Sequence, residues 1–221
     1  KKFLNAIGYK EIMNIKENNI VYGKEGLNIA HVSSGDIFRK YSSEDSELGR
    51  EINSYIKNGN LVPDELTIKM IGERLKEKDV ENGVILDGFP RTEAQAVALD
   101  KLLAEEGKKV DLVVDLDSPK EEILDRIVTR RICPDCKAVY NTKLNKPKVE
   151  GICDNCGATL YQREDDTVEK VENRIEVYRT STKPLEDYYE KANKLFKIEV
   201  TEKTGTMAKE AAEKVMEEIN K

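Results

Sequence analysis

The chain has 221 residues, of which 38% are hydrophobic and 36% are charged, and its formal net charge is −6. This length suits one medium-sized domain with inserted lobes, and the patterned apolar runs exclude general disorder. The negative charge argues against sequence-independent nucleic-acid binding, which usually needs a basic surface. We see no apolar run near eighteen residues and no signal peptide, so we expect a cytoplasmic protein without membrane contact.

The predicted elements alternate between short strands and helices. In chain order, strands are expected near 28–32, 84–86, 110–117 and 195–200, and a weak candidate for a first strand lies at 18–23. Helices are expected from 33 onward and over about 48–58, 64–78, 92–106, 119–131, 166–192 and 206–220. The run at 84–86 lies between Gly83 and Gly88, which is typical of a strand buried on both faces of a parallel sheet. This alternation predicts an α/β fold in which helices flank a parallel sheet.

Two stretches interrupt this rhythm and predict lobes outside the sheet. We expect a core domain formed by 1–32, 63–128 and 167–221, a helical lobe at 33–62 and an insert at 129–166. Ligands in such sheets bind beyond the carboxyl ends of the strands, where the segments 33–36 and 87–91 fall in this sequence. Nothing in the pattern indicates a coiled coil or a large apolar face, so we expect a monomer.

All four cysteines lie in the predicted insert as two C-x-x-C pairs. Cys133 and Cys136 form the first pair, and Cys153 and Cys156 form the second. Two such pairs at this spacing are a strong signal for a tetrahedral zinc site. Four thiolates close the coordination shell and leave no position for an activated water, so the metal should be structural and stabilise a small lobe.

Other interpretations of the cysteines remain open at this point. They could be free or redox-active thiols, or they could bind iron in place of zinc. A nucleic-acid-binding zinc ribbon is a further alternative, favoured by the lysines of the insert at 137, 143, 146 and 148.

Arginines gather in the sequence on both sides of the insert. Arg126, Arg130 and Arg131 precede or open it, and Arg163 and Arg174 lie near its end. Several guanidinium groups converging on one site suit a polyphosphate, whereas any single arginine could instead serve a solvated helix face. Asp87, at the end of a predicted strand, is either a magnesium partner or a turn aspartate. His31, the single histidine of the sequence, is interpreted as a packed or edge residue without chemistry.

Five segments together resemble a known family. They are "SSGDIFR" (33–39), "NLVPDE" (60–65), "LDGFPRT" (86–92) followed by Gln95, "RIVTRRICPDC" (126–136) and "QREDD" (162–166). The chain from about 28 to 221 is similar to adenylate kinases of the bacterial type with a zinc-binding lid, and "LDGFPRT" is the most specific of these motifs. The resemblance implies a phosphate-loop-kinase-like three-layer core, an AMP-binding lobe at 33–62 and a zinc-binding lid at 129–166.

The resemblance also implies a reaction and a set of site residues. The reaction is ATP + AMP to two ADP, with magnesium accompanying ATP and zinc in the lid, and with ATP, AMP and ADP rather than nucleic acid as partners. The AMP contacts would be Ser34, Arg39, Asn60, Leu61, Val62, Gly88, Phe89, Pro90, Arg91, Gln95, Arg163 and Arg174. The ATP contacts would be Arg126, Arg130, Val139 and Tyr140, and the catalytic group would be Asp87, Arg91, Arg130, Arg163 and Arg174.

One part of the family pattern is missing. Members open with a buried strand and a glycine-rich G-x-x-G-x-G-K-[GS]-T phosphate loop, which by the offset of "SSGD" should fall near 10–18. Those residues are "KEIMNIKEN", without a glycine, so no row of backbone N–H groups can surround a phosphate there. Gly23 and Lys24 lack the required spacing. We therefore expect impaired catalysis, or a non-catalytic nucleotide-binding member of the family.

Three explanations of this departure compete. A frame-shifted reading of an ordinary kinase gene agrees best with motifs that are intact everywhere downstream. The alternatives are a family member that lost catalysis and a segment that was replaced. The other reading frames upstream of "NIAHVSSGD" test the first explanation, because one of them should encode the glycine-rich loop.

Overall fold

The computed structural model describes residues 2–8, 30–199, 214–215 and 217–218. Its centre is a five-stranded sheet in the order β2-β3-β1-β4-β7, and every neighbouring pair is parallel. The strands are β1 (Lys2–Gly8), β2 (Ala30–Ser33), β3 (Gly83–Asp87), β4 (Leu112–Asp117) and β7 (Leu195–Glu199). The predicted α/β class is therefore confirmed, and the strand arrangement is consistent with a phosphate-loop kinase fold.

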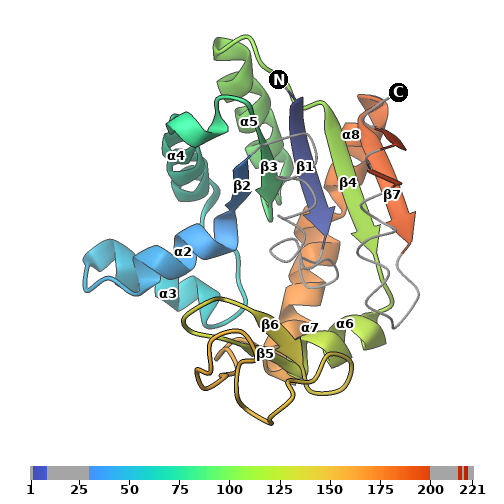
Figure 1. Ribbon diagram of the computed structural model, residues 1–221. Helices are drawn as coiled ribbons and strands as arrows, with labels where there is room; N and C mark the ends of the chain where they lie inside the picture. The colour runs from blue at the N-terminus through green and yellow to red at the C-terminus, as the bar shows by residue number, and fades with distance from the viewer. Residues whose placement is uncertain (1, 9–29, 200–213, 216, 219–221) are drawn as a thin grey trace.

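Helices connect the strands and pack against the sheet. They are α2 (Ser34–Ser42), α3 (Glu47–Ile56), α4 (Asp64–Arg74), α5 (Glu93–Glu105), α6 (Lys120–Val128), α7 (Val168–Val177) and α8 (Pro184–Lys191). Helices α5 and α8 lie behind the sheet in Figure 1, where Leu99 and Leu185 join the main hydrophobic core with strand β3. All five residues of β3 are buried, as expected for a strand in the interior of a parallel sheet.

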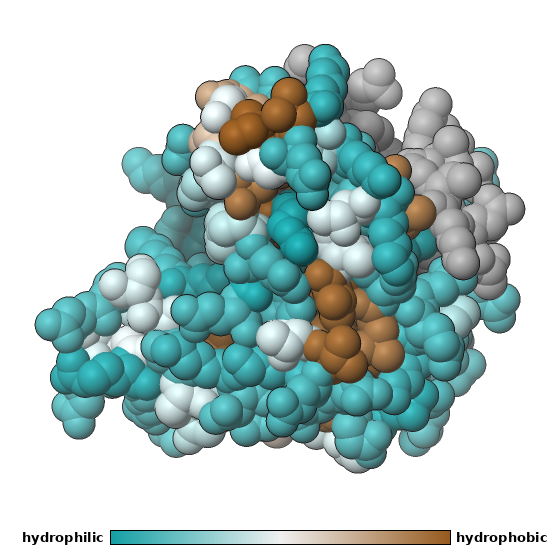
Figure 2. Space-filling view, turned by 90° about the horizontal axis from the view of Figure 1, so that it is seen from below, coloured by the Kyte–Doolittle hydropathy of each residue, from teal (hydrophilic) through white to brown (hydrophobic). Residues whose placement is uncertain are grey.

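Two smaller units lie outside this core. Helices α2 and α3 project to one side of the sheet (Figure 1) and share a separate cluster around Ile52, Val62 and Met70. The cysteine insert (129–166) holds the antiparallel pair β5 (Arg130–Ile132) and β6 (Val139–Asn141), and it lies beyond the edge toward which the strands of the sheet point. Figure 2 looks onto this side of the molecule and shows a mostly hydrophilic face with limited hydrophobic areas. The exact division into the three predicted units stays a prediction.

The prediction of the first strand was wrong. The structure places β1 at Lys2–Gly8, in the middle of the sheet, whereas the candidate at 18–23 lies outside the described residues. Asn5 separates Phe3 and Leu4 from Ala6 and Ile7, so this segment has no continuous apolar run of the kind that revealed β3.

Several helix ends also differ from the predictions. Helix α6 ends at Val128, because the chain then enters β5, and α4 ends at Arg74, before a short 3-10 turn at Lys78–Val80. The helix expected over 166–192 is divided into α7 and α8 by a π-helical turn at Tyr178–Thr182. Pro184 opens α8, as proline favours the first turn of a helix.

Most of the helix expected at 206–220 lies outside the described residues; residues 214–215 and 217–218 are helical. Within the part of the chain that the structure describes, no helix combines the length and the apolar character that a membrane crossing requires.

Candidate active site

The ends of strands β2 and β3 meet at the carboxyl edge of the sheet. Ser33 pairs with Asp87 in register, and helix α2 starts at the next residue, Ser34. The Ser34 hydroxyl donates to the carbonyl oxygen of Gly88 at 2.8 Å. Gly88 has φ +72°, and a Cβ at this position would lie 2.9 Å from Ser34 Oγ and 3.0 Å from Arg91 Nη2. Glycine is therefore required at 88 both by its backbone conformation and by this close approach.

His31 fixes the carboxylate of Asp87. Its Nε2 lies 3.2 Å from Asp87 Oδ2, and the two side chains are 6% and 4% exposed. His31 is packed, as the sequence indicated, but its partner could not be predicted from a strand pattern. His31 thus holds the Asp87 carboxylate at the edge of the sheet, where this carboxylate could bind magnesium directly or through a water molecule.

A pocket opens between the helical lobe, the end of β3 and helix α7. Its lining includes the following residues that were predicted to contact AMP: Ser34, Arg39, Asn60, Leu61, Val62, Gly88, Arg91, Gln95 and Arg174. Phe89, Pro90 and Arg163 were also predicted to contact AMP but are not among the lining residues, and Phe89 is buried in the main core. The peptide bond between Phe89 and Pro90 is cis.

The pocket has a cationic part and an apolar part. Arg39, Arg91 and Arg174 come from three separate segments of the chain and all reach it. Arg39 Nη2 donates to Asp36 Oδ1 at 2.6 Å, and Arg91 Nε donates to the carbonyl of Gly88 at 2.9 Å, so both side chains are positioned by their own segments. Phe38, Ile56 and Val62 line the pocket as well. Guanidinium groups beside an apolar surface suit a ligand with a phosphate at one end and a flat ring at the other.

Gln95 is held at both ends of its amide. It is 2% exposed in the first turn of α5, its Oε1 accepts from Arg91 N at 2.7 Å, and its Nε2 donates to Asp64 Oδ1 at 2.7 Å. The other oxygen of Asp64 accepts from Thr92 Oγ1 at 2.8 Å. Thr92 also caps α5, because its side chain accepts from Gln95 N. This network joins the start of α4 to the start of α5.

Arg130 forms a buried bidentate ion pair with Asp166. Nη2 donates to Oδ1 at 2.6 Å and Nε to Oδ2 at 3.0 Å, and the side chains are 8% and 0% exposed. Burial raises the pKa of Asp166, and the attraction of Arg130 and, more weakly, of Arg163 opposes that rise. Asp166 thus fixes the direction of Arg130 where the cysteine insert joins the core.

The other residues predicted to contact ATP lie on α6 and in the insert. Arg126 Nη2 is 3.8 Å from Glu122 Oε2, and the carbonyl of Arg126 accepts from Asn141 Nδ2 at 3.3 Å. Val139 is partly buried on β6. Tyr140 is 7% exposed, and its hydroxyl accepts from Asp154 N at 2.8 Å and lies 3.5 Å from Cys153 Sγ. The Tyr140 hydroxyl is therefore engaged inside the insert.

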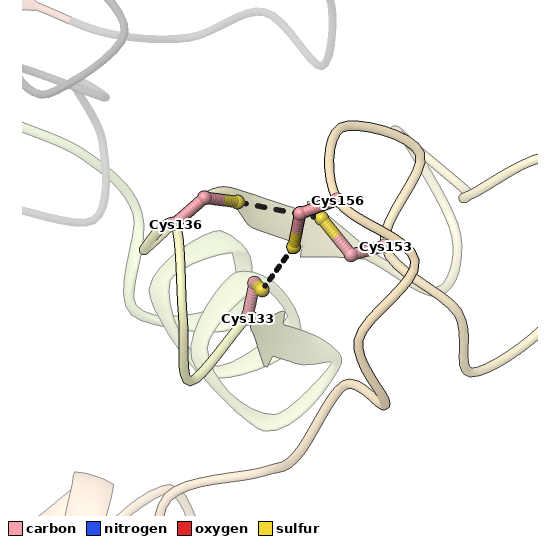
Figure 3. A group of neighbouring side chains, drawn as sticks. All are labelled: Cys133, Cys136, Cys153 and Cys156. Carbon is pink, nitrogen blue, oxygen red and sulfur yellow. Dashed lines mark hydrogen bonds between the residues drawn. The ribbon is translucent and has the colours of Figure 1, made fainter.

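The four cysteines converge as predicted. All of their sulfur atoms lie within 4.8 Å of one another, with Cys133 and Cys156 at 3.3 Å and Cys136 and Cys153 at 3.5 Å (Figure 3). Tetrahedral zinc–sulfur bonds place sulfur atoms about 3.8 Å apart, which agrees with this cluster. A hydrogen bond from Tyr140 lowers the pKa of Cys153 to about 6, which favours the thiolate that a metal needs. The donor set therefore fits a zinc ion.

Sequence reasoning assigned no role to three acidic partners in this region: Asp64, Asp165 and Asp166. Asp165 Oδ2 lies 3.7 Å from Arg174 Nη1, and Asp166 binds Arg130. The motif "QREDD" contains Asp165 and Asp166. These two adjacent acids lie close in the sequence to the arginines on both sides of the insert, and this proximity is the signal that could have predicted the ion pairs.

Comparisons with known proteins agree with these motifs. A family model described as adenylate kinase matches residues 20–194. The adenylate kinase of Thermosipho africanus is 49% identical over 174 residues, 79% of this chain and 81% of that protein, and that of Carboxydothermus hydrogenoformans is 49% identical over 173 residues, 78% and 81% of the two chains. The adenylate kinase of Streptomyces coelicolor is 46% identical over 190 residues, 86% of this chain and 88% of that protein. The chain belongs to the adenylate kinase family.

Proposed function

We propose that this chain is a nucleoside monophosphate kinase that transfers the terminal phosphoryl group of ATP to AMP and yields two ADP. The observation that carries the proposal is the pocket at the carboxyl edge of the sheet, which joins Arg39, Arg91 and Arg174 to an apolar surface and to Gln95. Phosphoryl transfer needs positioning and neutralisation of charge more than covalent participation by the protein. A set of arginines held by defined partners supplies both.

On the acceptor side, AMP would enter the pocket with its phosphate toward the arginines. Arg39 and Arg91 would bind the phosphate, and Ser34 and Gly88 would shape the space around it. Asn60, Leu61 and Val62 would line the adenine side, and Gln95 would bind the edge of the base. Phe89 and Pro90 would act by supporting this wall from behind.

On the donor side, ATP would lie between the core and the cysteine insert, which we propose as a lid. Arg126 and Val139 would contact its adenine, together with the backbone of Tyr140, while Arg130, Arg163 and Arg174 would neutralise the phosphates. Asp87 would hold magnesium, which travels with ATP and balances the charge of its phosphates. Zinc bound by Cys133, Cys136, Cys153 and Cys156 would keep the shape of the lid, whose closure excludes water.

The N-terminal segment limits the rate in this proposal. Strand β1 ends at Gly8, and its Ala6 is in register with Asp87, so the chain leaves the sheet at the edge where a phosphate loop is needed. Residues 10–18 contain no glycine. We propose that turnover is reduced for this reason, because a segment without glycine is poorly suited to the tight loop whose backbone N–H groups bind the β-phosphate. The same observation favours a second candidate, a nucleotide-binding protein without catalysis.

An ADP-forming assay separates the two candidates. Purified chain should convert ATP and AMP to ADP slowly, and a variant with a glycine-rich loop substituted at 10–18 should do so much faster. AMP binding without turnover in the original chain, followed by rescue in the variant, places the defect in the loop. Binding without turnover in both forms supports the second candidate. Salt-dependent binding of oligonucleotides would instead favour the zinc-ribbon alternative, which the net charge of −6 disfavours.

A further inference from the structure

We infer that Asp64 is a specificity-determining positioning residue: it holds the amide of Gln95 in one orientation and so makes the pocket prefer a 6-aminopurine over a 6-oxopurine monophosphate. The inference deepens the proposed function and rests on it, because it requires that the pocket binds AMP. Asp64 itself is not among the residues that line the pocket, whereas Gln95 is. Asp64 therefore acts through Gln95.

The two partners of Gln95 differ in chemistry. The Asp64 carboxylate can only accept hydrogen bonds when ionised, and the backbone N–H of Arg91 can only donate one. Nε2 of Gln95 faces the carboxylate at 2.7 Å and Oε1 faces the N–H at 2.7 Å. Turning the amide by half a rotation would put oxygen against oxygen and N–H against N–H. Two good hydrogen bonds would become two repulsive contacts in a side chain that is 2% exposed, so one orientation is fixed.

The carboxylate of Asp64 is itself held in place. Its second oxygen accepts from Thr92 Oγ1 at 2.8 Å, and Thr92 is the residue that caps α5 just before Gln95. Both oxygens of Asp64 therefore point at α5, one at the cap and one at the amide. Because α4 and α5 pack side by side, this geometry is part of the core and does not depend on a bound ligand.

A fixed amide offers the ligand a fixed pattern. Once one hydrogen and one lone pair of Gln95 are used, the amide retains one N–H donor and one acceptor lone pair at positions that cannot be exchanged. The edge of a 6-aminopurine carries a donor amine beside an acceptor ring nitrogen, and a 6-oxopurine carries an acceptor oxygen beside a donor N–H. A fixed amide can match one of these patterns and opposes the other, whereas an amide that is free to turn can match both. Rejection by unpaired buried groups is stronger than rejection by shape alone.

The test is the ratio of the dissociation constants for IMP and AMP, measured by calorimetric titration of the full chain, which does not depend on turnover. The informative variant is Asp64→Asn, which keeps the shape but can both donate and accept. We expect the wild-type chain to bind AMP more tightly and the ratio to fall by about tenfold or more in the variant, since a mismatched buried hydrogen bond corresponds to roughly that factor. The matched control is Asp79→Asn, which removes an exposed carboxylate paired with Arg74 and should leave the ratio unchanged.

A second comparison separates orientation from stability. Thr92→Val removes the cap of α5 and the hydrogen bond from Thr92 to Asp64 but leaves the acceptor that faces Gln95 Nε2, so it should lower the melting temperature and change the ratio less than Asp64→Asn does. An Asp64→Asn variant that weakens AMP and IMP equally, or that keeps the wild-type ratio, overturns the inference while the proposed function stands. A wild-type chain that binds neither nucleotide overturns the proposed acceptor site, and the inference with it.

Discussion

The buried pair between Arg130 and Asp166 gives a quantitative prediction for the joint between the core and the cysteine insert. At an effective dielectric constant near 20, two unit charges about 4 Å apart attract each other by about 4 kcal/mol. This pair has two hydrogen bonds, at 2.6 and 3.0 Å, and side chains that are 8% and 0% exposed. Removing either partner would take the bidentate hydrogen-bonding partner away from a charge that stays largely buried. Asp166→Leu and Arg130→Met should therefore each lower the free energy of unfolding by about 3–5 kcal/mol.

The double variant Arg130→Met with Asp166→Leu should lower the free energy of unfolding by much less than the sum of the two single variants. With both charges gone, their desolvation cost disappears, and leucine and methionine supply apolar contacts of similar size. We expect a coupling energy of about 2 kcal/mol or more from a double-mutant cycle measured by urea denaturation. Lys57→Met with Glu164→Leu is a matched control, because this pair is 4.0 Å apart and exposed, and its coupling should be below about 1 kcal/mol.

The pH dependence of the stability of Arg130→Met provides a second test of this pair. Burial already raises the pKa of Asp166, and without Arg130 that pKa should rise further. An acid whose pKa is higher in the folded than in the unfolded state stabilises the fold most below the unfolded pKa and loses this stabilisation as pH rises through the folded one. Arg130→Met should therefore be more destabilised at pH 8 than at pH 5. Additive single effects with no dependence on pH would refute the reasoning.

Three further predictions follow from other sites. Burial raises the pKa of Asp115 to about 6, so ionisation of this carboxyl lowers the free energy of unfolding as pH rises from about 4 through 6. Asp115→Asn should therefore raise the free energy of unfolding by about 2 kcal/mol at pH 8, after allowance for partial solvent screening, and should change it little at pH 4. Melting curves at the two pH values would check this. Tyr140→Phe should weaken zinc binding by about tenfold in a chelator competition, because the variant loses the hydrogen bond to Cys153. Tyr161 is exposed, so the control variant Tyr161→Phe should keep the wild-type zinc affinity. Equal zinc affinities of the two variants would show that the Tyr140 hydroxyl does not support the metal. Gly88→Ala should lower the free energy of unfolding by about 1–3 kcal/mol and abolish AMP binding, because the alanine Cβ would lie 2.9 Å from Ser34 Oγ at a φ of +72°. Unchanged AMP titration and melting curves would show that position 88 does not require glycine.

The sequence predicted strands where apolar residues form a continuous run, and this was sufficient for β3 and β4. It did not predict β1, because Asn5 interrupts the apolar residues of a strand that is central in the sheet. It also extended the helix after Pro119 to about Arg131, because arginine suits a helix end. The strand there depends on the pairing of Arg130–Ile132 with Val139–Asn141, which the local sequence does not show.

The candidate site was predictable where a motif carries it and not where it depends on a distant partner. The cysteine spacing alone predicted that four sulfur atoms would converge, and they do. The pair of Asp64 and Gln95 joins residues separated by 31 positions, and that of His31 and Asp87 by 56. Such partners are chosen by the packing of helices and strands, which no local pattern records.

Formation of ADP from ATP and AMP tests the central proposal most directly. We predict slow, AMP-dependent ADP formation by this chain, faster formation when a glycine-rich loop is restored at 10–18, and a loss of about 100-fold or more when Arg91→Ala is introduced into the restored form. A restored chain that forms no ADP from ATP and AMP would contradict the proposal.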